Sequence, residues 1–154
     1  HTIKDMGIPS LVLIERAALC TVEEIREPLF SKDRILLVCG SGNNGADGVA
    51  MARILHNRGV TAEIFLVGNK DRWTEEMRIQ IDIAKNYRVP FVNNPAWDEY
   101  TTIVDAIFGV GLSRKVSGSY NDVITSINAA SARVIFSRAG IVALRSASIR
   151  FFGL

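Results

Sequence analysis

The sequence is poor in cysteine, and this scarcity sets the first limits on its fold. Only Cys20 and Cys39 are present among 154 residues, without metal-ligand spacing and without a His or Cys partner nearby. A disulfide-stapled fold and a cysteine-rich zinc site are therefore excluded. Each cysteine lies in an apolar or amphipathic stretch, so both are predicted to be reduced core residues, and a reducing, cytoplasmic setting is expected.

Long apolar runs and a strong charge excess are also lacking. No run approaches the length of a transmembrane helix, and the first residues, HTIKDMGIPS, have neither the basic nor the apolar region of a signal peptide. The net charge is +2 with Lys and Arg spread along the chain, so neither nucleic acid nor a membrane is expected as a partner. Because the chain begins with His1 and not Met, we expect earlier residues in the natural protein, and organellar targeting information could lie there.

What the chain does have is an apolar content of 48%, enough for the core of one domain over residues 1–154. Its periodicity predicts a helix that follows Ser10 and stops near Pro28, and further helices at 45–58, 74–86 and 120–130. Strands are predicted at 34–39, 62–67, 89–92, 101–108 and 133–137. This alternation predicts a three-layer α/β/α Rossmann-like sandwich with a mostly parallel central sheet. Ligands bind beyond the carboxyl ends of such strands, so the candidate loops follow Cys39, Phe108 and Ser137.

A glycine-rich turn, GSGNNGADG, follows the first strand. Gly40, Gly42 and Gly45 satisfy the GxGxxG spacing directly after a buried strand and directly before a helix. Glycines let the backbone approach a phosphate closely, and the N–H groups of the following helix attract the anion. The turn is therefore predicted to form the floor of a nucleotide-binding site. The alternative is a tight turn that holds no ligand.

The second strand does not end as in an ordinary dinucleotide fold. That fold places an acidic residue there to hold the ribose hydroxyls, whereas this strand is followed by Gly68 and Asn69. A dehydrogenase that uses ordinary NAD is thus disfavoured. The glycine turn also carries amide and carboxylate side chains, NNGAD, that a simple phosphate cradle does not require.

Four stretches resemble the YjeF N-terminal domain family, whose best-known members are NAD(P)H-hydrate epimerases and which is also known for apolipoprotein A-I binding proteins. They are GIPSLVLIERAA at 7–18, VCGSGNNGADG at 38–48, VDAIFGVGL at 104–112 and ALRSASIRFFGL at 143–154. The second and third stretches are the specific ones. Ala46 stands where many members have a glycine, a small change that should leave the loop usable. The resemblance implies epimerisation of hydrated NADH or NADPH, termed NADHX and NADPHX.

The resemblance also implies two groups of substrate-binding residues. The first group is in the glycine turn and comprises Asn43, Asn44, Gly45, Ala46 and Asp47. The second group forms the opposite wall and comprises Gly109, Val110, Gly111, Leu112, Ser113, Arg114 and Lys115. For the last two residues, a solvated loop pair is the alternative.

A potassium ion is the cofactor that the resemblance implies, with Asn44 and Asp105 as its ligands. The chemistry is reasonable, because a hard cation prefers amide, carboxylate and carbonyl oxygens. The alternative for Asp105 is a carboxylate that only caps the end of its strand.

The catalytic loop of the family is not found after Ser137. The family places Asp-Ile-Pro-Ser-Gly there, with the Asp as acid/base and the Ser as an ion ligand, but this chain reads VIFSRAGIVALRS. Strands at Val134–Ser137 and Leu144–Phe152 are expected to pair in parallel, and six residues are too few for that crossover. We therefore expect a loop missing between about 137 and 143, visible as a spatial break. The alternative is a genuine deletion.

Two functions from different classes follow. The first is an isomerase, the epimerase, in which a carboxylate acts as general acid and then base on the hydrated ring. The second is a non-catalytic nucleotide-binding or scaffold domain, of the mRNA-decapping enhancer or apolipoprotein-binding type. Retention of Asn44, Asp47 and Asp105 favours the enzyme. The expected partners are a fused or separate NAD(P)H-hydrate dehydratase and a second copy of the chain, because the first helix has more apolar residues than one buried face needs.

Overall fold

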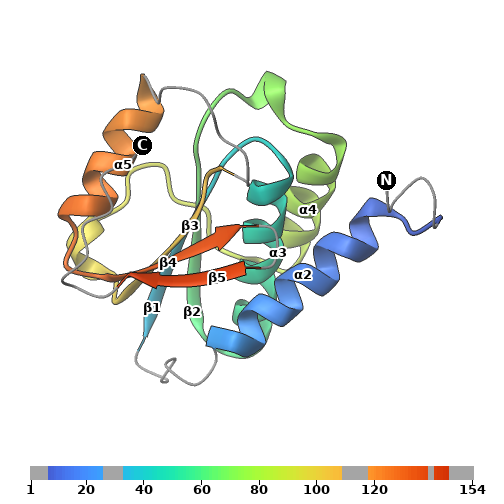
Figure 1. Ribbon diagram of the computed structural model, residues 1–154, viewed down its shortest axis with the longest axis horizontal. Helices are drawn as coiled ribbons and strands as arrows, with labels where there is room; N and C mark the ends of the chain where they lie inside the picture. The colour runs from blue at the N-terminus through green and yellow to red at the C-terminus, as the bar shows by residue number, and fades with distance from the viewer. Residues whose placement is uncertain (1–6, 26–32, 109–117, 139–140, 146–154) are drawn as a thin grey trace.

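The computed structural model describes residues 7–25, 33–108, 118–138 and 141–145, which contain one central sheet (Figure 1). In the order in which they lie in the sheet, the strands are β2 (Thr61–Leu66), β1 (Arg34–Cys39), β3 (Thr102–Ala106), β4 (Arg133–Arg138) and β5 (Ile141–Arg145). Strands β2, β1, β3 and β4 are parallel, and β5 joins β4 in the antiparallel direction. The predicted mostly parallel α/β fold is confirmed.

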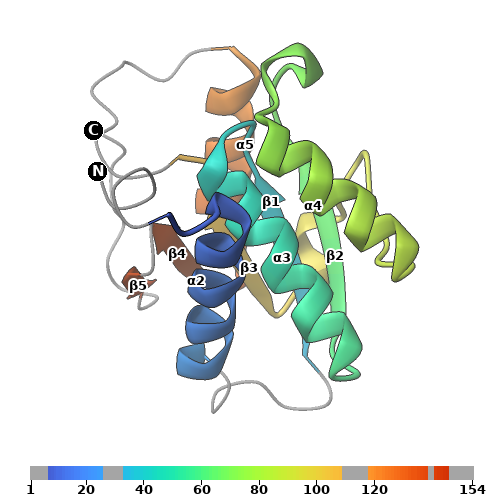
Figure 2. The same ribbon diagram turned by 90° about the vertical axis from the view of Figure 1, so that its right-hand side faces the viewer.

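Helices cover both faces of this sheet. On one face lie α2 (Ser10–Ile25), α3 (Asn43–Asn57) and α4 (Glu75–Asn86), side by side in Figure 2. On the other lies α5 (Ser119–Ala129), with the short 3-10 helix η2 (Trp97–Glu99). A second 3-10 helix, η1 (Lys70–Arg72), precedes α4. Across the described ranges, none of the helices is long and apolar enough to span a membrane.

Strand β1 is the centre of the core. Its residues 35–39 have no solvent-exposed surface, as its continuous apolar sequence predicts for a strand covered on both faces. Ile35, Leu37 and Cys39 belong to the buried cluster under α2, α3 and α4. Leu36 and Val38 belong to the cluster under α5. This alternation is the period of two that a strand imposes.

The order in which the strands are added to the sheet changes side after β2, and this change determines where the site lies. From β1 the chain passes through α3 to β2 on one side, then through α4 to β3 on the other side of β1. The carboxyl ends of β1 and β3 are therefore neighbours at the topological switch point, where doubly wound folds bind ligands. A backbone hydrogen bond of 3.1 Å from Gly40 N–H to Ala106 O joins these two ends.

Several predicted boundaries need correction. Helix α3 begins at Asn43 and not at Gly45, so two of the predicted site residues lie in a helix and not in a loop. The predicted strand at 89–92 is only an isolated parallel bridge between Ile64 and Phe91. Pro90 explains the short pairing, because proline has no N–H to donate to a ladder. The strand predicted at 101–108 is shorter, as β3.

The connection after Ser137 also differs from the prediction. Strand β4 continues to Arg138, which pairs with Ile141 of β5 in the antiparallel direction, so the expected parallel pairing is wrong. The spatial break expected between about 137 and 143 stays a prediction. The physical reason is loop length: antiparallel strands need only a two-residue connection, whereas parallel ones need a dozen or more. Residues 139–140 lie outside the described part of the chain. That the natural protein carries a longer loop here stays a prediction.

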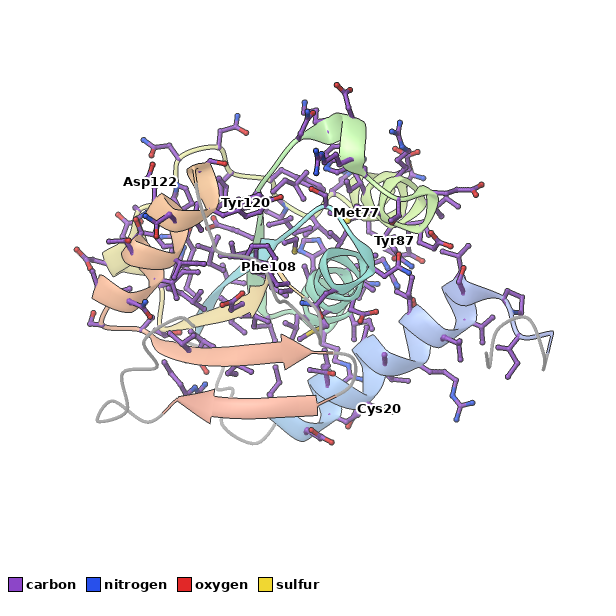
Figure 3. The ribbon with its side chains drawn as sticks, turned by 45° about the horizontal axis from the view of Figure 1, so that its top comes forward. Cys20, Met77, Tyr87, Phe108, Tyr120 and Asp122 are labelled. Carbon is purple, nitrogen blue, oxygen red and sulfur yellow. The ribbon has the colours of Figure 1, made fainter. Side chains whose placement is uncertain are left out.

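Helix α2 packs mainly on α3, not on the sheet. Its buried side is lined by Ile14, Ala18, Thr21, Val22 and Ile25. Cys20 falls on the opposite side and is exposed, so its assignment to the core was wrong, whereas Cys39 is buried as predicted (Figure 3). One ion pair joins Glu15 of α2 to Arg53 of α3. A second joins Glu23 of α2 to Arg58, the residue directly after α3.

Candidate functional site

The glycine turn is shaped by close backbone contacts. A methyl group on Gly45 would lie 1.9 Å from the carbonyl oxygen of Gly40, and one on Gly40 would lie 2.1 Å from that of Ile107. Both glycines therefore allow the turn to pack against α3 and the end of β3. A methyl group on Gly42, in contrast, would have no neighbour within 4 Å among the described residues, so on that side the backbone is open to a ligand.

The N-terminus of α3 follows this open position directly. Gly42 is the residue before the helix, and no side chain from the described residues caps it. The first N–H groups of a helix carry a partial positive charge and lack partners within the helix. The turn therefore has the geometry of an anion-binding site, as the glycine spacing predicts.

Asn44 lies in the first turn of α3 and joins it to the end of β3. The side chain is 8% exposed, and its Nδ2 donates to the carbonyl oxygen of Phe108 over 2.9 Å. Its Oδ1 is buried and accepts no hydrogen bond within the described ranges. A buried amide oxygen without a donor costs free energy, so this atom is suited to a cation or to a polar ligand group.

Two carboxylates come from the same two elements, α3 and β3. Asp105 is on β3, and its Oδ1 accepts the N–H of Ile107 over 3.1 Å. This is the strand-end cap that the sequence offered as the alternative role of Asp105. Asp47 lies one turn further along α3, and burial raises its pKa to about 7. Burial, and then the charges of Asp105 and Asp47, raise the pKa of the Cys39 thiol, so that group stays protonated beneath the site.

Thr74 supports the glycine turn from the side of α4. Its N–H donates to Ser41 O over 3.2 Å, and its Oγ1 donates to Asn43 Oδ1 over 3.1 Å. The same Oγ1 caps α4 by accepting the N–H of Met77. Sequence reasoning placed a helix start at Thr74 but missed this second role, because the bonds join segments about thirty residues apart.

Two aromatic side chains, from the end of β3 and from α5, lie on the side of the glycine turn that faces away from Thr74. Phe108 follows β3, Tyr120 is in the first turn of α5, and their ring centroids are 5.1 Å apart (Figure 3). The hydroxyl of Tyr120 lies 3.4 Å from Ser41 Oγ in the glycine turn. One signal for this contact is present in the sequence, the glycine after the second strand, but it does not identify the residue that fills the space.

The structure thus brings one group of predicted site residues together at the carboxyl ends of β1 and β3. The group comprises Asn43, Asn44, Gly45, Ala46, Asp47 and Asp105. The predicted second wall, Gly109–Lys115, lies outside the described residues. The same holds for the connection at 139–140, close to the expected catalytic loop.

Comparison with known proteins places the chain in a family. The family described as YjeF-related protein N-terminus matches residues 10–141. The chain is 46% identical over 137 residues to the NAD(P)H-hydrate epimerase of Oenococcus oeni, covering 88% of this chain and 65% of that protein. It is 43% identical over 136 residues to that of Weissella koreensis, covering 88% of this chain and 62% of that protein.

A solved structure agrees on the fold. The yeast protein ynu0 superposes with a TM-score of 0.76 at 23% identity, covering 86% of this chain and 62% of that one. The chain spans slightly less than two thirds of the length of the relatives named above.

Proposed function

Because the chain belongs to the family of the YjeF-related protein N-terminus, we propose that it is an NAD(P)H-hydrate epimerase, an isomerase that interconverts the R and S forms of NADHX and NADPHX. The observation that carries this proposal lies at the switch point: among the described residues, the buried Oδ1 of Asn44 has no hydrogen-bond partner and no side chain caps the adjacent N-terminus of α3. The phosphates of the substrate require an anion site, which the helix N-terminus can provide. The reacting ring requires polar side chains that hold it in a fixed orientation.

Different residues would bind the phosphates, orient the ring and transfer the proton. The backbone of the glycine turn and the first turn of α3 would bind the phosphates, and the amides of Asn43 and Asn44 would orient the hydrated ring. Epimerisation requires a proton to be given to the leaving hydroxyl and taken from the returning water. Asp47, with its pKa of about 7, is suited to hold or move a proton near neutral pH. The family's own acid/base is expected in a loop after Ser137.

We propose potassium as the cofactor, held by Asn44 and Asp105. An amide oxygen without a hydrogen-bond donor and a carboxylate are hard oxygen ligands, so the residues present fit such an ion. When bound, the ion would supply fixed positive charge at the edge of the site.

The test is the Asp105→Ala variant, compared with Asp105→Asn. Asp105 is partly exposed at a strand end, so both variants should fold. Asp105→Ala should lose potassium binding and most epimerase activity on purified NADPHX, while Asp105→Asn, which keeps an oxygen for Ile107 N–H, should retain part of both. Full activity of Asp105→Ala would reject the potassium assignment.

A second function is favoured by one observation. Strand β4 passes into β5 through two residues, which leaves no room in this chain for the family's longer loop. A nucleotide-binding domain without the acid/base would show NADPHX binding by calorimetry and no epimerisation by the same sample. Activity of the wild-type chain would exclude this alternative.

The partners are part of the same proposal. The epimerised product would pass to an NAD(P)H-hydrate dehydratase, fused or separate, and the setting would be cytoplasmic. A homodimer is supported by the outer side of α2, where Val12 is 45% and Leu19 43% exposed. A monomeric mass by light scattering would reject the dimer.

A further inference from the structure

The space beyond the end of β2 is filled by a tyrosine side chain instead of the acidic side chain that an ordinary dinucleotide fold has there. Gly68 has a φ of +98°, and a methyl group at this position would lie 2.1 Å from the hydroxyl oxygen of Tyr120 and 2.8 Å from Ser41 Oγ. An ordinary dinucleotide fold has an acidic side chain here that binds the 2′-hydroxyl of the adenosine ribose. In this chain the glycine leaves that space to a tyrosine from α5.

The position of Tyr120 is fixed from two sides. Its ring packs at 41° to the ring of Phe108, with 5.1 Å between centroids, and its hydroxyl lies 3.4 Å from Ser41 Oγ. The residue is partly exposed, so the hydroxyl is held by packing and still reaches the site. Figure 3 shows it between α5 and α3, beside Phe108 and away from the exposed Tyr87.

Two neighbouring hydroxyls have a defined recognition chemistry. Each hydroxyl offers one donor and two acceptor lone pairs. A pair 3.4 Å apart can exchange hydrogen bonds with the adjacent hydroxyls of a ribose, since each partner has both a donor and acceptors. The pair carries no negative charge, so it can equally donate to the oxygens of a 2′-phosphate, which a carboxylate would repel.

We propose that Tyr120 and Ser41 form the subsite for the adenosine ribose, in place of the acidic residue that usually ends the second strand. This inference rests on the proposed epimerase function and deepens it. It gives a physical reason for one site to accept both NADHX and NADPHX: a neutral hydroxyl pair tolerates both a 2′-hydroxyl and a 2′-phosphate.

The test compares Tyr120→Phe with Tyr87→Phe. The first removes only the hydroxyl and keeps the ring against Phe108, and the second makes the same change at an exposed tyrosine at the end of α4. In Tyr120→Phe, KM should rise about three- to tenfold for both substrates, the effect of one neutral hydrogen bond, with kcat within about twofold. Tyr87→Phe should behave as the wild type.

A third substrate separates ribose binding from a structural effect. NADHX prepared from 2′-deoxyadenosine NAD lacks the hydroxyl, so the wild-type KM should already be raised and Tyr120→Phe should add nothing. An unchanged KM for NADHX in Tyr120→Phe, or an equal loss with the deoxy substrate, would overturn the subsite. If the wild type epimerises neither substrate, the proposed function fails, and the same comparison of NADHX dissociation constants by calorimetry still decides the subsite.

Discussion

The side-chain amide of Asn44 donates to the carbonyl oxygen of Phe108, which binds the first turn of α3 to the end of β3. Asn44→Ala would leave that carbonyl without this donor, so we expect the free energy of unfolding to fall by about 1–3 kcal/mol. The variant also removes Oδ1. The rise in Tm that KCl should give the wild type, relative to choline chloride, should therefore be lost.

The control for this prediction is Asn86→Ala, the same change at an exposed asparagine at the end of α4. It should keep the potassium-dependent rise in Tm. A rise that persists in Asn44→Ala would contradict the role of Oδ1 as a ligand.

Two glycines of the turn, Gly45 and Gly42, should separate into a structural and a ligand-facing position. Gly45→Ala brings a methyl group to 1.9 Å from Gly40 O, so we expect a loss of stability of about 3 kcal/mol or more. Gly42→Ala meets no neighbour and should cost about 1 kcal/mol or less. In urea unfolding the two variants should differ clearly, yet both should weaken NADPHX binding. Equal stability of the two would refute the packing argument.

The stability of the protein should depend on pH through Asp47. Its pKa is about 7 when folded and about 4 when unfolded, so the neutral form favours the folded state below pH 4, and this contribution is lost as the pH rises to 7. Asp47→Asn mimics the neutral form. In potassium-free buffer it should match the wild type near pH 4. A shift of about three pKa units corresponds to about 4 kcal/mol, and solvent screening at this partly exposed carboxyl reduces the effect, so the variant should be more stable by about 1–3 kcal/mol at pH 8.

Urea unfolding at both pH values measures this difference, with Asp82→Asn as the matched change at an exposed acid on α4. That control should not reproduce the gain in stability that Asp47→Asn shows at pH 8. A pH-independent effect of Asp47→Asn would show that its carboxyl is not desolvated.

Thr74 should couple the stability of α4 to binding at the glycine turn. Thr74→Val removes the cap of α4 and the bond to Asn43, so it should cost about 1–2 kcal/mol and raise KM for NADPHX several-fold. Thr74→Ser keeps the hydroxyl and should restore most of both. If Thr74→Ser is as impaired as Thr74→Val in KM, the hydroxyl is not what positions Asn43.

The fold could be predicted because each of its signals is local. The apolar run at residues 34–39 and the glycine turn after it determine a buried strand, its end and the next helix without reference to distant residues. The parallel pairing expected between the strands at Val134–Ser137 and Leu144–Phe152 failed for the opposite reason. Whether two strands pair in parallel depends on the length of chain between them and on the rest of the sheet, and neither appears in strand periodicity.

The predicted site residues also rest on local signals. Asn44 and Asp105 were assigned through motifs that are contiguous in sequence. Tyr120, which we propose for the ribose subsite, comes from another helix, and only the space left by Gly68 points to it. A small residue in a sequence indicates room, but not the side chain that fills it.

The peripheral packing of α2 has a consequence for hydrogen exchange. Because α2 rests mainly on α3, it can detach without opening the central strands, as a unit of lower local stability. Its amides should then exchange with deuterium faster than those of β1, and the rates should increase when Arg53 or Arg58 is replaced and its ion pair with α2 is lost. The glycine turn would keep its protection during such openings, so binding and the partial unfolding of α2 would be energetically separate events.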